Sequence, residues 1–149
     1  MGNTKSIGVA YSDQDIDGGT IGAVTPATVV GTTVYATTEI GYTTAAQGAV
    51  TQLTDKSTAV TLNKSAGQIT MNNASLATVT TVSFTLNNSV IGAKDTLVVC
   101  ISSGATTGAY LVYVSNLTAG AATISLRNFT AGPLSEAVVI NFSIIHAVA

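Results

Sequence analysis

The residues best suited to bind a metal ion form one acidic turn near the N-terminus. Asp13, Asp15 and Asp17 alternate with other residues and precede a glycine, which matches the first half of a calcium-binding loop. The second half of that signature requires a bidentate glutamate at the twelfth position, which is Val24 in this chain. Because half of the ligand set is missing, we interpret the segment as a solvated acidic turn. Whether these three carboxylates bind an ion is left open by the sequence.

Residue types that perform catalysis are scarce. His146 is the only histidine and has no cysteine, aspartate or glutamate near it in the sequence, whereas a zinc site needs at least three protein ligands. The sequence does not exclude a serine–histidine–aspartate triad, because the members of a triad come together only in the folded chain. No G-x-S-x-G nucleophile motif is present, however. We therefore predict no enzyme and assign no catalytic, cofactor-binding or metal-binding residue. The other carboxylates stand alone in the sequence, without a partner for acid–base catalysis: Glu39, Asp55, Asp95 and Glu136.

Charge is scarce along the whole chain. Charged residues make up 8% of the 149 residues, against about 25% in an average soluble domain, while the 46% of hydrophobic residues is ordinary. The surface must consist largely of threonine, serine, asparagine and glycine, and a net charge of -2 gives copies of the chain little mutual repulsion. This composition favours a protein that packs into an assembly. The basic residues are scattered singly, which argues against a nucleic-acid partner: Lys5, Lys56, Lys64, Lys94 and Arg127.

The single cysteine and the hydropathy of the chain argue against two further classes of protein, disulfide-bonded scaffolds and membrane-spanning proteins. Cys100 is the single cysteine, so no intrachain disulfide forms, and its place in the apolar run 97–101 predicts a small buried side chain. The first residues lack the apolar core of a signal peptide, and no run approaches the roughly 20 apolar residues of a membrane span. We expect neither a cofactor nor a membrane partner.

Short apolar-patterned segments alternate with turn residues from Thr58 onward. Their spacing of roughly 8–12 residues is typical of β-sandwiches, and no window shows the apolar spacing of a helix. We predict an all-β fold: an antiparallel β-sandwich of jelly-roll or immunoglobulin-like type, with seven to eight strands and an extended N-terminal arm. The first two segments, joined through 63–67, are predicted to form a hairpin. Strands are expected at 59–62, 68–71, 80–86, 96–101, 109–114, 122–127 and 137–147.

Two of these expected strands are apolar on both faces. Segment 96–101 does not alternate, and in 137–147 the face with Ile140 and Phe142 is backed by another face with Val139 and Ile145. Such strands are covered on both sides within the fold or half-covered by another subunit, because exposed apolar bands aggregate. The pattern predicts a homo-oligomer, and we favour a trimer over a dimer.

The domain boundary is expected near Thr44. Residues 1–44 form a glycine-rich arm whose β-leaning pieces, such as 6–11 and 32–37, are too short to bury a face alone. Residues 45–149 form the sandwich domain. The arm is expected to be ordered only where it lies on its own body, on another copy or on a partner. Gly22 and Pro26 direct an extended chain, which reaches about 3.3 Å per residue.

The tyrosines offer a binding surface or a set of anchors. Tyr110 and Tyr113 are three apart in an expected strand and therefore point to opposite faces. We interpret them as lining the sandwich rim, and Tyr11, Tyr35 and Tyr42 as anchoring the arm, in preference to a sugar- or protein-binding surface.

The body also carries an extended sequence pattern. It comprises GAVTQLTDKSTAVTLNK (48–64), GQITMN (67–72), VSFTLNNS (82–89) and LSEAVVINF (134–142), and residues 48–147 follow it throughout. This pattern resembles a domain that recurs in small bacteriophage virion structural proteins. In the arm, TIGAVTP (20–26) is similar to repeats and connectors of phage tail-fibre and head-surface proteins.

The resemblance implies a function that the residue chemistry does not contradict. It implies a decoration or cement protein on the outer surface of a bacteriophage capsid, assembled in the bacterial host cytoplasm, with the major capsid protein and copies of itself as partners. The alternative is a short tail-fibre or spike subunit that binds a host-surface receptor through the loops 102–108 and 128–133. A hydrolase of surface polysaccharide is a third class, disfavoured because no acid pair or triad motif is present.

Overall fold

The computed structural model describes residue 31 and residues 33–147. The chain divides into two units, Met1–Glu39 and Ile40–Ala149. In the first unit, residues 33–39 form no helix or strand and are exposed. The predicted acidic turn, the tail-fibre-like segment 20–26 and the piece 6–11 lie outside the described residues.

The second unit is a β domain that begins with a single 3-10 turn, η1 (Thr44–Ala46). Eight strands follow, in agreement with the seven to eight expected from the spacing of the apolar segments. They are β1 (Gln47–Thr51), β2 (Val60–Thr61), β3 (Ala66–Thr70), β4 (Thr81–Asn87), β5 (Thr96–Ser103), β6 (Tyr110–Thr118), β7 (Ala121–Asn128) and β8 (Val139–Ile145). β1 was not among the predicted strands, because its glycine interrupts the apolar alternation.

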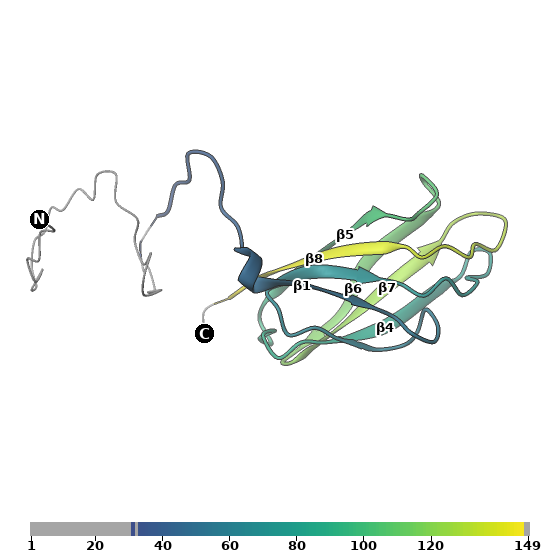
Figure 1. The fold of residues 1–149 in the computed structure, drawn as a ribbon, viewed down its shortest axis with the longest axis horizontal. Helices are drawn as coiled ribbons and strands as arrows, with labels where there is room; N and C mark the ends of the chain where they lie inside the picture. Colours follow the sequence, from purple (N-terminus) through teal and green to yellow (C-terminus); the bar gives the residue numbers. More distant parts are fainter. Residues whose placement is uncertain (1–30, 32, 148–149) are drawn as a thin grey trace, which may run out of the picture. The chain divides into compact units, whose positions relative to one another are not determined.

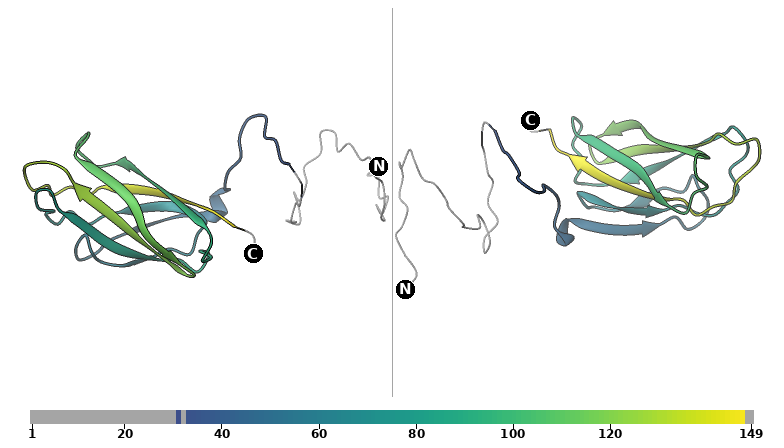
Figure 2. Two further views of the ribbon diagram at one scale, coloured as in Figure 1. Left: turned by 180° about the vertical axis from the view of Figure 1, so that it is seen from behind. Right: turned by 90° about the horizontal axis from the view of Figure 1, so that it is seen from above.

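The strands form two four-stranded sheets that pack as a sandwich (Figures 1 and 2). Sheet A has the order β1-β3-β8-β5, and sheet B has the order β2-β4-β7-β6. The predicted β-sandwich is therefore confirmed. Four of the strand pairs are antiparallel, as predicted, but β1–β3 and β2–β4 are parallel, so both sheets are mixed.

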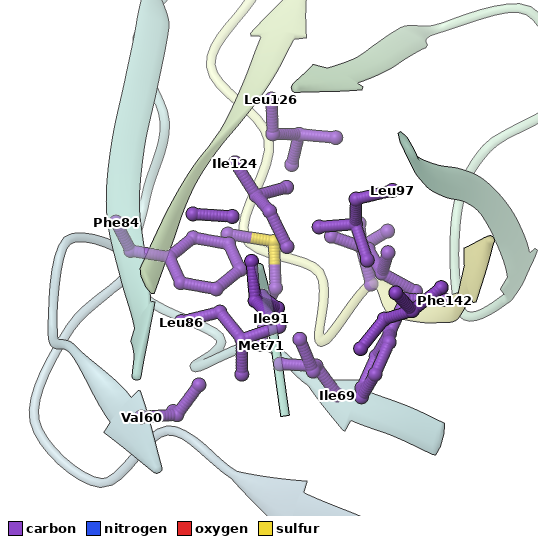
Figure 3. Close-up of a cluster of buried hydrophobic side chains, with 14 of the residues drawn as sticks. Val60, Ile69, Met71, Phe84, Leu86, Ile91, Leu97, Ile124, Leu126 and Phe142 are labelled. Atoms are coloured by element: carbon purple, nitrogen blue, oxygen red, sulfur yellow. The ribbon is translucent and has the colours of Figure 1, made fainter. Parts of the chain in front are cut away.

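Alternate residues of the strands meet between the sheets and form one core (Figure 3). From β4 the inward residues are Val82, Phe84 and Leu86, as the alternation predicted. From β8 they are Ile140, Phe142 and Ile144, each no more than 3% exposed. Burial of these side chains is the main favourable contribution to folding, since each contributes about 1.5–3 kcal/mol relative to an exposed position.

The predicted hairpin of 59–62 and 68–71 is wrong. β2 pairs with β4 in sheet B, whereas β3 pairs with β1 and β8 in sheet A. The connector between them crosses from one sheet to the other, and the Leu62 side chain packs against Gly67, where an added Cβ would lie 2.8 Å from it. Asn88 Nδ2 donates to the Lys64 carbonyl and holds the crossing in place. Turn residues between two strands predict that the chain reverses direction. They do not predict whether the two strands then pair in the same sheet or lie in different sheets.

The prediction of a buried Cys100 is also wrong. β5 is an edge strand of sheet A, and its residues alternate between the core and the surface. Leu97 is buried, while Val98 and Cys100 face outward and are exposed. The same holds for β8, where Ile144 is in the core and Ile145 is 61% exposed. The second apolar face of both strands therefore has no cover within the described part of the chain.

Candidate functional site

The arm enters the body at a set of hydrogen bonds around Tyr42. The Tyr42 hydroxyl donates to the carbonyl of Ile144 near the end of β8. Gln47 Nε2 donates to the Tyr42 carbonyl over 2.7 Å, and Lys64 Nζ donates to the carbonyl of Ala45 over 2.8 Å. η1 and the C-terminal end of β8 lie at the same end of the sandwich (Figures 1 and 2). We name these contacts the arm root; they fix the chain to one end of the sandwich just before β1.

Two open hollows flank Tyr42. One, of about 400 Å³, is lined by polar and glycine residues that include Gln47, Gln68 and Asn141. The other, of about 590 Å³, is lined mainly by Ile40, Ile145 and His146. Their walls offer amide groups and apolar surface, which suit peptide contacts better than acid–base chemistry.

Beside the second hollow, the structure forms a histidine–aspartate pair that the sequence did not reveal. His146 Nδ1 lies 2.7 Å from Asp95 Oδ2, and the Asp95 carboxylate also accepts from the backbone N–H groups of Gly92 and Ala147. In residues 31 and 33–147, no serine or threonine hydroxyl hydrogen bonds to His146. Two of the three positions of a triad are therefore present, and the pair ties the end of β8 to the loop before β5.

Loss of the Asp95 carboxylate is expected to destabilise the protein at neutral pH and to matter less in acid. The N–H groups of Gly92 and Ala147, with a smaller contribution from His146, lower the pKa of Asp95 below its ordinary 3.8. A carboxyl whose pKa is lowered by folding stabilises the fold above its unfolded-state pKa, and this stabilisation is lost as pH falls through the folded-state pKa. The difference in unfolding free energy between wild type and Asp95→Ala should therefore shrink below about pH 4.

Urea unfolding followed by circular dichroism at a series of pH values measures this difference. Glu39→Ala is the matched control, because Glu39 makes no hydrogen bond or ion pair with any described residue. A difference for Asp95→Ala that stays constant from neutral to strongly acidic pH would contradict the assignment.

A second cluster of titratable groups lies at the opposite end of the sandwich. The Lys56 side chain is 3% exposed, and its Nζ donates to the carbonyls of Asn72 and Glu136. Burial lowers the pKa of Lys56, and the nearby Glu136 carboxylate opposes that shift. The Tyr110 hydroxyl is buried without a hydrogen bond to a described residue, and burial, helped by Glu136, raises its pKa. Because Lys56 is buried and its Nζ donates to two carbonyls, the cluster connects the loops that carry these residues. The lysine amine is therefore not accessible as a nucleophile.

The four described tyrosines are split between structural and exposed positions. Tyr42 anchors the arm root, as interpreted from the sequence, whereas Tyr35 is 91% exposed among the described residues. Tyr110 packs against the core and Tyr113 faces outward, which confirms that they point to opposite faces. Tyr11 lies outside the described residues.

The described part of the chain supplies no cluster for metal chemistry. It contains no group of three or more histidine, cysteine, aspartate or glutamate side chains placed to hold an ion. It also contains no helix that is long and apolar enough to cross a membrane. The candidate site is therefore a set of surfaces: the arm root, the edge strands and the outward apolar residues.

Comparison of the chain with protein-family models, with curated proteins and with solved structures finds no match.

Proposed function

We propose that this protein is a structural component of a bacteriophage virion that decorates and stabilises the outer capsid surface, and that it has no enzymatic role. The resemblance of residues 48–147 to small virion structural proteins supports this proposal. So do the low fraction of charged residues, 8% of the chain, and the hydrogen bonds that hold the arm root.

The observation that carries the proposal is the nature of the sheet edges. None of the edge strands β1, β2, β5 and β6 contains a charged residue or a proline, which are two of the devices that proteins use to block edge-to-edge pairing. β2 is blunted in another way, since it has only two residues. β5 and β6 each carry one register shift, at 101–103 and 114–116. The regular stretches 96–101 and 110–114 precede these shifts and remain able to pair with a strand from another chain.

The stabilisation would act through many weak contacts. Edge pairing adds main-chain hydrogen bonds between subunits, and the arm adds a second attachment at high effective concentration. The partners are the major capsid protein and copies of this chain, with a trimer favoured over a dimer. Nucleic acid and membrane are not partners in this proposal, and the protein would assemble onto capsids in the host cytoplasm.

Co-sedimentation with capsids that lack this protein tests the proposal. The full-length chain is expected to bind saturably and in fixed ratio to capsid subunits, and a chain lacking Met1–Glu39 to bind much more weakly. The truncated chain retains the arm root, all eight strands and the whole core, so it is expected to stay folded. Absence of capsid binding by the full-length chain would overturn the decoration role, and binding to host cells instead would support the tail-fibre alternative.

A further inference from the structure

The outer face of sheet B carries an exposed apolar patch built around one arginine. We name Val79, Leu111, Tyr113, Arg127 and Phe129 the outer patch. Its four apolar or aromatic side chains are between 39% and 56% exposed. Tyrosine and arginine are enriched where proteins bind one another, and solvent-exposed clusters of large apolar side chains mark such surfaces.

The members of the outer patch are neighbours across three chain segments. Leu111 of β6 stands opposite Arg127 of β7 in the antiparallel ladder. The Arg127 guanidinium lies over the ring of Phe129, 5.2 Å from its centroid. Thr78 Oγ1 donates to the Thr130 carbonyl and Asn128 N–H donates to the Thr80 carbonyl, so Val79 lies beside Phe129. The patch is therefore continuous.

Two features of the patch are unfavourable in the isolated domain. Arg127 Nε is buried and has no hydrogen-bond partner among the described residues, and no carboxylate there forms an ion pair with the guanidinium. Val79 has φ of 51°, a left-handed conformation that is strained for a β-branched residue and is typical of functional sites. An occupant that supplies a carboxylate and apolar contacts would give the Arg127 guanidinium an ion-pair partner and cover the exposed side chains.

The acidic side chains of the body are not available to Arg127. Asp55 accepts from Ser57 and Thr58, Asp95 from His146, and Glu136 from Thr106. Of the seven side-chain carboxylates, Glu39 stands alone, whereas three stand together in the arm, at Asp13, Asp15 and Asp17. In an extended conformation these three would share one face with Val9 and Tyr11, because alternate residues of a strand point the same way. That face would combine the negative charge that the outer patch lacks with apolar side chains that would cover its exposed apolar residues.

We propose that residues 9–17 of one copy bind the outer patch of a second copy, with a carboxylate of Asp13, Asp15 or Asp17 paired to Arg127. The patch lies where β7 ends, and the arm root lies at the opposite end of the sandwich, beside the end of β8 (Figure 1). The contact is heterologous, since it joins two different surfaces, and it closes a ring such as a trimer when the rotation between copies allows. This inference rests on the proposed assembly role for the expectation that copies contact one another.

Complementation between two full-length variants tests the contact. Arg127→Glu removes the cation of the patch but leaves the arm intact, and the triple variant Asp13→Asn, Asp15→Asn, Asp17→Asn leaves the patch intact but neutralises the arm. Each variant alone is expected to be a monomer in sedimentation velocity at concentrations where wild type assembles. A mixture of the two should form a 1:1 dimer, because one arm and one patch remain functional, and added salt should weaken it.

The controls separate this contact from misfolding and from the virion role, and the mixture separates it from binding within one chain. Lys94→Glu alters net charge as Arg127→Glu does, on an exposed residue outside the patch, and should assemble like wild type. Near-UV circular dichroism should show that Arg127→Glu is folded. A mixture that stays monomeric, or variants that assemble like wild type, would overturn the proposal. Because no capsid is present in this experiment, such a result would not bear on the decoration role, which the co-sedimentation experiment tests separately.

Discussion

Replacing Asn128 with alanine is expected to destabilise the body by about 3 kcal/mol, because buried carbonyl groups left without a donor cost roughly 1–3 kcal/mol each. Asn128 is fully buried at the end of β7. Its Nδ2 donates to the carbonyls of Leu76, Ala77 and Gly132, and its Oδ1 accepts from the backbone N–H and the hydroxyl of Thr130. One amide therefore holds three segments together at the end of the sandwich that carries the outer patch.

Urea unfolding measures the effect as a shift in the midpoint at an unchanged slope. Asn128→Asp separates the donor from the acceptor, since it keeps an accepting oxygen but removes both N–H groups, and it should be at least as destabilising as Asn128→Ala. The control is Asn116→Ala on β6, an exposed asparagine whose side chain bonds to no described residue, with an expected change within about 0.5 kcal/mol. Equal losses of unfolding free energy for Asn128→Ala and Asn116→Ala would refute the role of the Asn128 amide.

The sequence predicted seven of the eight strands of the body, all but β1, because the signal for a strand is local. Alternation of apolar and polar residues indicates which side chains face the core, and Phe84, Leu86 and Ile140 were all assigned to the correct face. Pairing is not local. Whether β2 continues into a hairpin or crosses to the other sheet depends on contacts such as the one between Leu62 and Gly67, and no pattern in residues 59–71 distinguishes the two paths.

The features of the candidate site were harder to predict for the same reason. Asp95 and His146 are 51 residues apart and meet only because β5 and β8 are paired. Cys100 stands in an apolar run, which favours burial, but β5 is an edge strand whose outward face is not covered by any part of the chain that the structure describes. The buried Lys56 and Asn128 are of residue types that usually lie at the surface, and only their hydrogen bonds explain their burial.

Truncation of Ile140 to alanine is expected to destabilise the body by about 2–5 kcal/mol, the range for removing a large aliphatic side chain from a packed core. Ile140 is fully buried near the start of β8 and stands between Ile69 of β3 and Ile101 of β5. The surrounding strands are paired on both sides of β8, so they cannot close on the cavity without breaking ladder hydrogen bonds, which places the cost toward the upper part of that range.

The same strand supplies the matched control. Ile145→Ala removes the same atoms from an outward position that is 61% exposed, so the stability of the monomer should change by no more than about 0.5 kcal/mol. Thermal and urea unfolding of both variants at low protein concentration make the comparison. A similar loss at both positions would mean that the outward face of β8 is covered even in the monomer. A loss at Ile140 alone would leave that face free for contacts with another chain, as the decoration role requires.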